Sequence, residues 1–256
     1  DMTVHKVCAE EPFLLSELGE SVEAVIDVQA RNHTRRNHTA THLLQAALRQ
    51  VLGEHAHQSG SRVDPSSLRL DFTHFRAVDE QELQRVEQQV NEWILADRPV
   101  STAVKPIEEA REEGAIALFG EKYGETVRVV SVEGVSKEFC GGTHVSSTGQ
   151  IGMFHVTSES SIAAGTRRIE AVTGMGTLRY LTQKESVVSG LGTLLKGGEE
   201  KLQDRVNALL SEQRALEERL AELSAGHVER EAEAIMSEAR SDTGGVPWVV
   251  KDVGGV

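Results

Sequence analysis

The sequence predicts an α+β fold, and three observations indicate that class. Amphipathic helical patterns and short runs rich in β-branched residues both occur along the chain, and they alternate without a strict βαβ rhythm. The glycine-rich fingerprints of dinucleotide-binding and P-loop proteins are absent. Charged residues make up 26% of the 256 residues and hydrophobic residues 39%, which is typical of a folded globular chain. We therefore expect mixed strands and helices, followed by a helical segment toward the C-terminus.

The N-terminal part of the chain is expected to hold a strand and then a helix. Residues 22–28 alternate in polarity, which predicts a strand. Asn37 is a good N-cap, and Gly53 can end the helix that Asn37 opens. The apolar residues of that helix recur at helical spacing, at Ala40, Leu43, Leu44, Ala47 and Val51.

A second helix and three strands are expected in the middle of the chain. Asp79 caps this helix, which ends before Pro99. Its apolar stripe consists of Leu83, Val86, Val90 and Ile94. Short runs rich in β-branched residues predict strands at Val100–Val104, Val127–Val132 and Ile151–Thr157. Two shorter helices are expected near Ile107–Glu113 and Gly176–Val188.

The C-terminal part of the chain predicts a coiled coil. From Leu202 to Leu223 the seam residues follow at alternating spacings of four and three, with the polar Gln213 among them. Gly226 breaks the seam and a second apolar stripe follows it, so we expect a helical hairpin over residues 196–241. The alternative is one kinked helix docked on the preceding domain. The coiled coil would join two copies of the chain into a homodimer or would span to a further domain.

Residues 242–256 are expected to form a linker and the start of a truncated C-terminal domain. Gly244, Gly245 and Pro247 are typical linker residues, and the apolar run at residues 246–250 is typical of a strand. The chain also has no initiator methionine. We therefore expect a fragment of a longer protein.

Charge and cysteine content restrict the partners and the location. The formal net charge is −13, which disfavours a broad nucleic-acid surface because phosphate contacts need positive charge. Residues 31–36, however, hold three arginines and no acid, which leaves room for a local basic patch. No apolar run approaches the roughly 20 residues of a membrane span, and Asp1–Glu11 does not resemble a signal peptide. Cys8 and Cys140 cannot form a disulfide scaffold, so a cytoplasmic location is expected.

Two short motifs predict a metal site. His38 and His42 are four residues apart, so on a helix they lie one turn above each other on the same face. The paired glycines between Cys140 and His144 favour a tight loop that turns both side chains toward one point. One thiolate and three imidazoles suit tetrahedral zinc. Each half alone is a weak signal, but both halves in one domain favour Zn²⁺ as the cofactor.

Four motifs resemble the editing domain of the alanyl-tRNA synthetases. They are residues 31–44 (RNHTRRNHTATHLL), 114–124 (GAIALFGEKYG), 140–144 (CGGTH) and 161–174 (SIAAGTRRIEAVTG). The family's HxxxH and CxxxH zinc motifs match residues 38–42 and 140–144 of this chain. The resemblance extends from about residue 20 to about residue 185, and the four motifs stand in the family's order.

This resemblance implies a domain order and an activity. Residues 1–30 would be the end of a preceding β-barrel region, and residues 31–190 would be the zinc-dependent editing domain. The implied activity is hydrolysis of mischarged Ser-tRNA(Ala), and also of Gly-tRNA(Ala), at the aminoacyl ester, with the acceptor end of tRNA(Ala) as the partner. A pocket built for alanine cannot strongly exclude serine, so a second site must remove the error. Nothing resembles the aminoacylation domain, so no aminoacylation is expected from this chain.

Three residues are predicted to act on the substrate. The resemblance marks Gln58 as functional, and its amide can orient a water molecule but cannot act as a general base. Thr39 and Thr41 flank the zinc ligands, and their hydroxyls would hydrogen-bond the hydroxyl of serine. The alternative is that at least one of the two threonines caps the helix or bonds back to its own turn.

Arginines are predicted to contact the RNA. Arg167 and Arg168 would clamp the terminal phosphates, because a guanidinium matches phosphate geometry. Adjacent residues of a strand point to opposite faces, so one of the two, with Arg167 favoured, would do so. The alternative is a surface ion pair with Glu170 or another acid. Three further arginines would support the acceptor stem or would simply be solvated: Arg31, Arg35 and Arg36.

The role of the metal stays open at the level of sequence. Four protein ligands make a closed site, which is typical of structural zinc, whereas catalytic zinc keeps an open position. A competing interpretation is therefore a non-catalytic, zinc-stabilised fragment that binds tRNA or forms oligomers. A zinc peptidase is disfavoured because its helical motif needs a glutamate after the first histidine, and residue 39 is a threonine.

Overall fold

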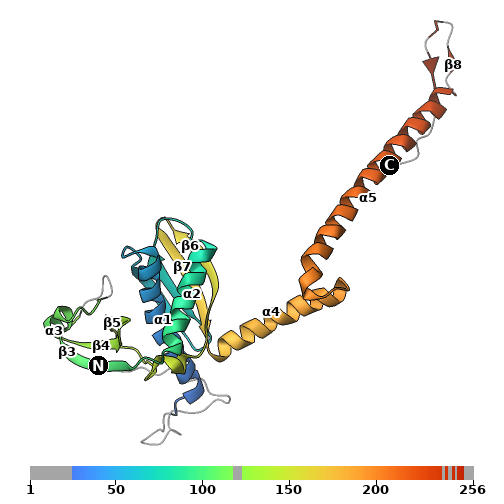
Figure 1. Ribbon diagram of the computed structural model, residues 1–256. Coiled ribbons are helices and arrows are strands. Elements are labelled where there is room, and N and C mark those ends of the chain that lie inside the picture. Colours follow the sequence, from blue (N-terminus) through green and yellow to red (C-terminus); the bar gives the residue numbers. More distant parts are fainter. Residues whose placement is uncertain (1–24, 118–122, 238–239, 242–243, 246, 251–256) are drawn as a thin grey trace, which may run out of the picture. The chain divides into compact units, whose positions relative to one another are not determined.

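The computed structural model describes residues 25–117, 123–237, 240–241, 244–245 and 247–250 (Figure 1). The chain divides into two compact units, residues 1–181 and residues 182–256. The predicted α+β class is confirmed, because helices and two antiparallel sheets make up the first unit. Among the described residues, no helix is both long enough and apolar enough to cross a membrane.

A four-stranded antiparallel sheet with two helices packed against it forms the main body of the first unit. The strand order is β1-β2-β7-β6. The strands are β1 (Gln58–Val63), β2 (Leu68–Thr73), β6 (Phe154–Ala163) and β7 (Thr166–Thr173). The helices are α1 (Val28–Leu52) and α2 (Glu80–Leu95), which pack on each other and on the sheet (Figure 1).

The core of this body lies between the helices and the sheet. Leu43, Leu44 and Leu48 of α1 are fully buried, and Phe72 of β2 and Val90 of α2 are buried with them. Replacing such a leucine by alanine costs about 2–5 kcal/mol of stability. The face of α1 that carries these leucines is therefore fixed against the sheet, and the position of its other faces follows from that.

A smaller three-stranded sheet completes the first unit. Its order is β3-β4-β5, and it is antiparallel throughout. The elements are β3 (Val100–Pro106), α3 (Ile107–Glu112), β4 (Thr126–Val132), β5 (Ser136–Phe139) and the 3-10 helix η2 (Thr148–Ile151). A separate apolar cluster around Phe139 and Ala110 lies between α3 and these strands. α1 contacts β5 as well as the larger sheet, so this one helix joins the two sheets.

Helix α1 begins earlier than the sequence predicts. Asp27 is its N-cap and accepts a hydrogen bond from the Ala30 amide at 2.9 Å. The prediction of Asn37 as the N-cap is wrong, because Asn37 is buried inside the helix and bonds Asp64 and Thr173 through its side chain. The predicted strand over residues 22–28 is wrong at Val28, which opens α1, while residues 22–24 lie outside the described residues.

Most of the other predicted elements are confirmed. The Asp79 side chain and Glu82 form a capping box at the start of α2, and Gly53 ends α1. The strand predicted from Ile151 begins only at Phe154, because Ile151 belongs to η2. No pattern predicted β1, β2 or β5. The alternation of buried residues in β2 was a usable signal: Leu68, Leu70 and Phe72.

The second unit is mainly helical. α4 (Met175–Leu194) begins in the first unit, and η3 (Glu199–Lys201) and α5 (Leu202–Ser237) follow it. The predicted hairpin is wrong, because α5 runs without a break through Gly226. A glycine inside a helix costs only about 1 kcal/mol relative to alanine, and the helix formers around it can offset that. No residue of α5 is buried, so the predicted coiled coil stays a prediction.

The C-terminal prediction falls largely outside the described residues. Arg240–Ser241 (β8) pairs with Pro247–Trp248 (β9) as a short antiparallel ladder. The expected linker and domain start at residues 242–256 are described only at residues 244–245 and 247–250.

Candidate metal centre and the adjoining cavity

The structure brings the four predicted metal ligands together. His38 and His42 stand one turn apart on α1, and Cys140 and His144 come from the loop that follows β5. One ligand atom of each residue lies within 4.8 Å of those of the other three. The Cys140 Sγ atom is 3.5 Å from His38 Nε2 and 3.3 Å from His144 Nε2. The set converges as a metal-binding group must.

The loop half of the set needs glycine at residue 142 for a steric reason. The backbone of Gly142 lies against the ring of His38, and a Cβ added there would overlap that ring. A Cβ at Gly141, by contrast, would meet nothing within 4 Å. The first of the paired glycines is therefore not required by space, whereas the second allows the close approach of the loop to α1.

Distant side chains hold the loop in place. The Arg128 guanidinium donates through Nη1 to the carbonyl oxygens of Cys140 at 2.8 Å and Gly142 at 2.5 Å. Arg35 donates through Nε to the carbonyl of His144 at 2.6 Å. These bonds fix the backbone on both sides of the paired glycines, where no regular secondary structure does so.

The outer nitrogens of the buried imidazoles are also held. Nδ1 of His42 lies 2.7 Å from the Glu138 carboxylate, whose other oxygen accepts a bond from Ser136. Nδ1 of His144 lies 3.2 Å from the Thr39 hydroxyl. Nε2 of His42 is buried and has no hydrogen-bond partner among the described residues. Such an orphaned nitrogen costs free energy unless a metal ion or another group satisfies it.

Electrostatics favour the metal-binding form of the cysteine. Burial raises the pKa of the Cys140 thiol, but hydrogen bonds with His144 and His38 and the positive charge of His42 bring it down to about 3. Burial lowers the pKa of His42, but the Glu138 carboxylate and Cys140 outweigh it and raise that pKa to about 10. Cys140 is therefore a thiolate at neutral pH, which is the form that binds a metal. One thiolate and three imidazoles fit zinc.

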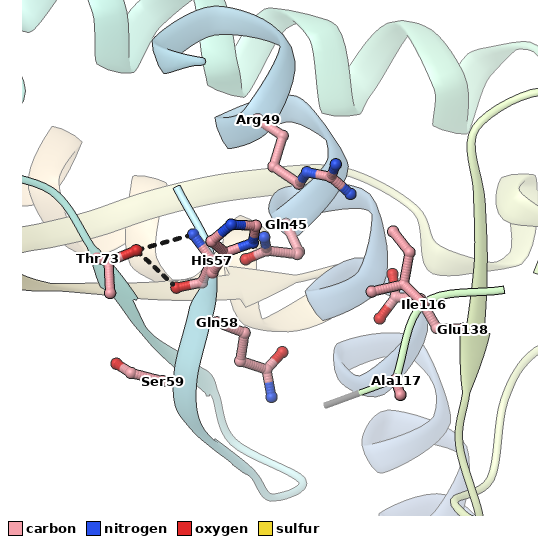
Figure 2. Close-up of a pocket in the computed structure, with 9 residues that line it drawn as sticks. All are labelled: Gln45, Arg49, His57, Gln58, Ser59, Thr73, Ile116, Ala117 and Glu138. Atoms are coloured by element: carbon pink, nitrogen blue, oxygen red, sulfur yellow. Dashed lines mark hydrogen bonds between the residues drawn. The ribbon is translucent and has the colours of Figure 1, made fainter. Parts of the chain in front are cut away.

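A cavity of about 530 Å³ adjoins this group (Figure 2). It lies between α1, β1, β2 and the segment around Ile116, which pairs with Glu138 of β5. Its lining residues are Gln45, Arg49, His57, Gln58, Ser59, Thr73, Ile116, Ala117 and Glu138. The side chain of Gln58 points into it from β1 (Figure 2). Glu138 lines the cavity and also bonds His42, so the cavity and the metal ligands share one residue.

Comparisons with known proteins agree with this arrangement. The family model described as "Threonyl and Alanyl tRNA synthetase second additional domain" matches residues 127–170. The alanine–tRNA ligase of Thermus thermophilus is 47% identical over 99% of this chain and 29% of its own length. That of Solibacter usitatus is 45% identical over 91% of this chain and 27% of its own, and that of Thermotoga petrophila 50% identical over 80% and 24%.

The chain belongs with the alanine–tRNA ligases, in their editing-domain region. It spans less than a third of the length of these relatives, from 24% to 29%. Within the editing region, the family match at residues 127–170 includes both loop ligands, Cys140 and His144.

The two threonines beside the helix ligands are buried in this editing region. Thr39 is 0% exposed and Thr41 is 3% exposed. Each hydroxyl bonds back to the carbonyl four residues earlier, at 3.1 Å for Thr39 and 2.9 Å for Thr41. Thr39 also accepts a bond from the Val145 amide at 3.2 Å. Both threonine side chains therefore bond back to their own helical turn, which is the alternative stated above. Contact with a serine substrate stays a prediction.

Both arginines that are predicted to clamp phosphates form ion pairs with carboxylates. Arg167 makes a bidentate pair with Glu159, with both distances 2.6 Å. Arg168 makes a bidentate pair with Asp71 at 2.7 and 2.8 Å. The alternative of an ion pair is thus observed for both, with partners other than Glu170. Phosphate binding by one of them stays a prediction.

Two residues that support the metal ligands are not predicted by any sequence pattern. Glu138 and Arg128 hold the ligands from β5 and β4, 96 residues from His42 and 12 residues from Cys140 in the chain. No spacing rule links such pairs. The only available signal was their position next to a predicted ligand or in a predicted strand, which many residues share.

Proposed function

We propose that this chain hydrolyses the aminoacyl ester of mischarged Ser-tRNA(Ala), and also of Gly-tRNA(Ala), at the metal centre and its cavity. The observation that carries the proposal is the double role of Glu138, which bonds the ligand His42 and lines the cavity that contains Gln58. The acceptor end would place its ester beside the metal ligands and its amino acid in the cavity. Membership of the editing region of the alanine–tRNA ligases supports this reaction.

Gln58 would orient the water that attacks the ester. Its Nε2 donates to Ser61 at 3.0 Å, and its carbonyl oxygen has no partner among the described residues. That oxygen can accept a hydrogen bond from a water molecule, but an amide cannot take up the proton. The ribose oxygen that leaves would receive it. Zinc, when bound by the four ligands, would supply a Lewis-acidic positive charge beside the ester.

The remaining predicted residues would act through the ligands. Thr39 would keep His144 in one orientation, since its hydroxyl bonds both the ring and the following amide. Thr41 would reach a serine hydroxyl only by giving up its bond to the Asn37 carbonyl. Selection of serine would then depend on polar groups that already face the cavity, among them Gln45, Gln58 and Thr73.

The test is release of serine from purified Ser-tRNA(Ala), with Ala-tRNA(Ala) as the control substrate. We expect the wild-type chain to release serine selectively. Cys140→Ala should lose both bound zinc and activity, because it removes the thiolate ligand. Gln58→Ala should keep its zinc and lose about 100-fold in rate, as expected for loss of a group that positions a reactant. Zinc is counted in each sample by elemental analysis.

A second candidate function rests on the closed ligand set. Four protein ligands, with His42 and His144 each held by a second residue, are typical of structural zinc. The chain would then be a zinc-stabilised tRNA-binding or oligomerisation fragment. Full zinc content and tRNA binding, with serine never released under any condition, would support this second function and exclude the first.

A further inference from the structure

One face of α1 connects a second, smaller pocket with the metal centre and the cavity. Arg35, His38, His42, Gln45 and Arg49 follow at spacings of three and four, so their side chains share one ridge of the helix. The helix rises about 1.5 Å per residue, so Arg35 stands only about 5 Å along the axis from His38. The cavity begins on the other side of the ligands, at Gln45.

The small pocket has a volume of about 220 Å³ and a basic lining. Its residues are Asn32, Arg35, Arg36, Val145 and Gln150. Both arginines are half-buried. Each is anchored through its Nε to a backbone carbonyl: Arg35 to His144 at 2.6 Å and Arg36 to Gln150 at 2.8 Å. No carboxylate lines the pocket.

The free charge of these two arginines sets them apart from the other adjacent pair. Arg167 and Arg168 are each neutralised by a bidentate carboxylate. In the described part of the chain, Arg35 and Arg36 make no ion pair, and their Nη groups have no partner. A guanidinium has five N–H donors, so each of them keeps four for a ligand. Two uncompensated guanidiniums in one pocket are notable in a chain with a net charge of −13.

We propose that Arg35 and Arg36 bind a backbone phosphate of the RNA acceptor end. A guanidinium fork matches phosphate oxygens, and the Nε anchors remove part of the side-chain entropy that binding would otherwise cost. The RNA strand would cross the metal ligands along the ridge of α1, with its phosphate at Arg35 and Arg36 and its amino acid in the cavity near Gln45. This inference rests on the proposed function, because it assigns the RNA end to that same site.

Arg36→Gln is the informative variant. Glutamine can still donate to the Gln150 carbonyl, and Arg36 touches no metal ligand, so the zinc site should remain intact. Arg85→Gln is the matched control, since it removes the same charge from an exposed position of α2. Arg36→Lys keeps the charge without the fork. Zinc content and thermal unfolding show whether each full-length variant is folded.

The measurement is binding of an uncharged RNA hairpin with a single-stranded 3′ end to the zinc-loaded chain, at several salt concentrations. For Arg36→Gln we expect about tenfold weaker binding, and a slope of log K against log salt that is smaller by about one. Arg36→Lys should lie between this variant and the wild type, and Arg85→Gln should match the wild type. A blunt hairpin and inorganic phosphate serve as competitors, and both should compete poorly.

The outcomes separate this inference from the proposed function. On Ser-tRNA(Ala), Arg36→Gln should raise KM about tenfold and leave kcat unchanged, since a phosphate contact is made equally before and in the transition state. Three results would each overturn the phosphate assignment. They are equal RNA binding by Arg36→Gln and Arg85→Gln, no RNA binding by the wild type, and competition by inorganic phosphate as strong as by the unlabelled hairpin with the single-stranded 3′ end. The proposed function fails instead if RNA binds as expected but serine is never released.

Discussion

The two halves of the metal-ligand set are built in different ways. His38 and His42 stand on a continuous helix, where backbone hydrogen bonds fix their spacing and a fully buried face fixes their direction. Cys140 and His144 stand on a loop with two glycines and no regular secondary structure. The bonds that hold this loop come from β4 and α1, through Arg128, Arg35 and Thr39.

The difference teaches where each half is vulnerable. The helix half depends on local geometry and core packing, so a change in one polar neighbour should leave its two histidines close to their places. The loop half depends on a few hydrogen bonds and one close approach, so single substitutions far from the metal atoms should disturb it. Zinc affinity, measured by competition with a chelator, is the common scale for the variants that follow.

The largest effect is expected for Gly142→Ala. A Cβ at this position would overlap the His38 ring, so the loop or the histidine must move and the two halves separate. We expect zinc affinity to fall at least about 100-fold, the upper end of the range for lost support of a metal ligand. Gly141→Ala is the matched control, because a Cβ there meets nothing within 4 Å and the variant should bind zinc as the wild type does. Equal affinities for the two variants would contradict the steric argument.

Loss of the Arg128 clamp should come next. Arg128→Met keeps an unbranched apolar stem but removes the donors to the Cys140 and Gly142 carbonyls. We expect zinc affinity to fall roughly 10–100-fold, while the fold of both sheets is retained. Circular dichroism reports the fold, and exchange of the cysteine-loop amides with deuterium reports the loop. If the substitution accelerates exchange more at α1 than at the loop, this would argue against a clamp that acts on the loop half.

The same contrast between local and distant causes explains how far the sequence could predict the fold. The start of α2 was predictable because Asp79 and Glu82 form the capping box within one turn. The start of α1 was not, because Asn37 looks like a cap but its side chain instead bonds Asp64 and Thr173, which lie far along the chain. The periodicity in α5 predicted a helix, but periodicity alone does not say what covers the apolar stripe of that helix. Gly226 was interpreted as a helix end, whereas α5 tolerates it in its interior.

The residues of the candidate site also differ in whether local spacing or distant contacts determine them. The four ligands were predictable, because residue chemistry and spacings of four carry the signal within each motif. Their supports were not, because pairs such as Glu138 with His42 exist only through the contact between α1 and β5. The sequence also offered Arg167 and Arg168 as phosphate ligands from residue type alone, and their carboxylate partners Glu159 and Asp71 became visible only in the sheet register.

A smaller effect is expected when the helix half loses its carboxylate support. Glu138→Gln keeps the volume and one acceptor for His42 Nδ1 but removes the charge. Because the helix holds the ring in place, we expect zinc affinity to fall only about tenfold, at the low end of the range for a lost supporting group. The Nδ1 and Nε2 chemical shifts of His42 measure whether its tautomer is still fixed. A loss larger than that of Arg128→Met would reverse the proposed order of the two halves.

The smallest effect on zinc affinity is expected for Thr39→Val. This variant tests the comparison of the two halves directly, because Thr39 lies on the helix half but supports the loop half. Valine keeps the β-branched shape, yet the buried Val145 amide loses its acceptor and His144 loses its partner at Nδ1. An unsatisfied buried amide costs about 1–3 kcal/mol, so stability should fall by about that amount and zinc affinity several-fold. Thr39→Ser retains the hydroxyl and should restore both quantities. If Thr39→Val keeps the stability of the wild type but loses selectivity for serine over alanine, the hydroxyl serves the substrate and not His144.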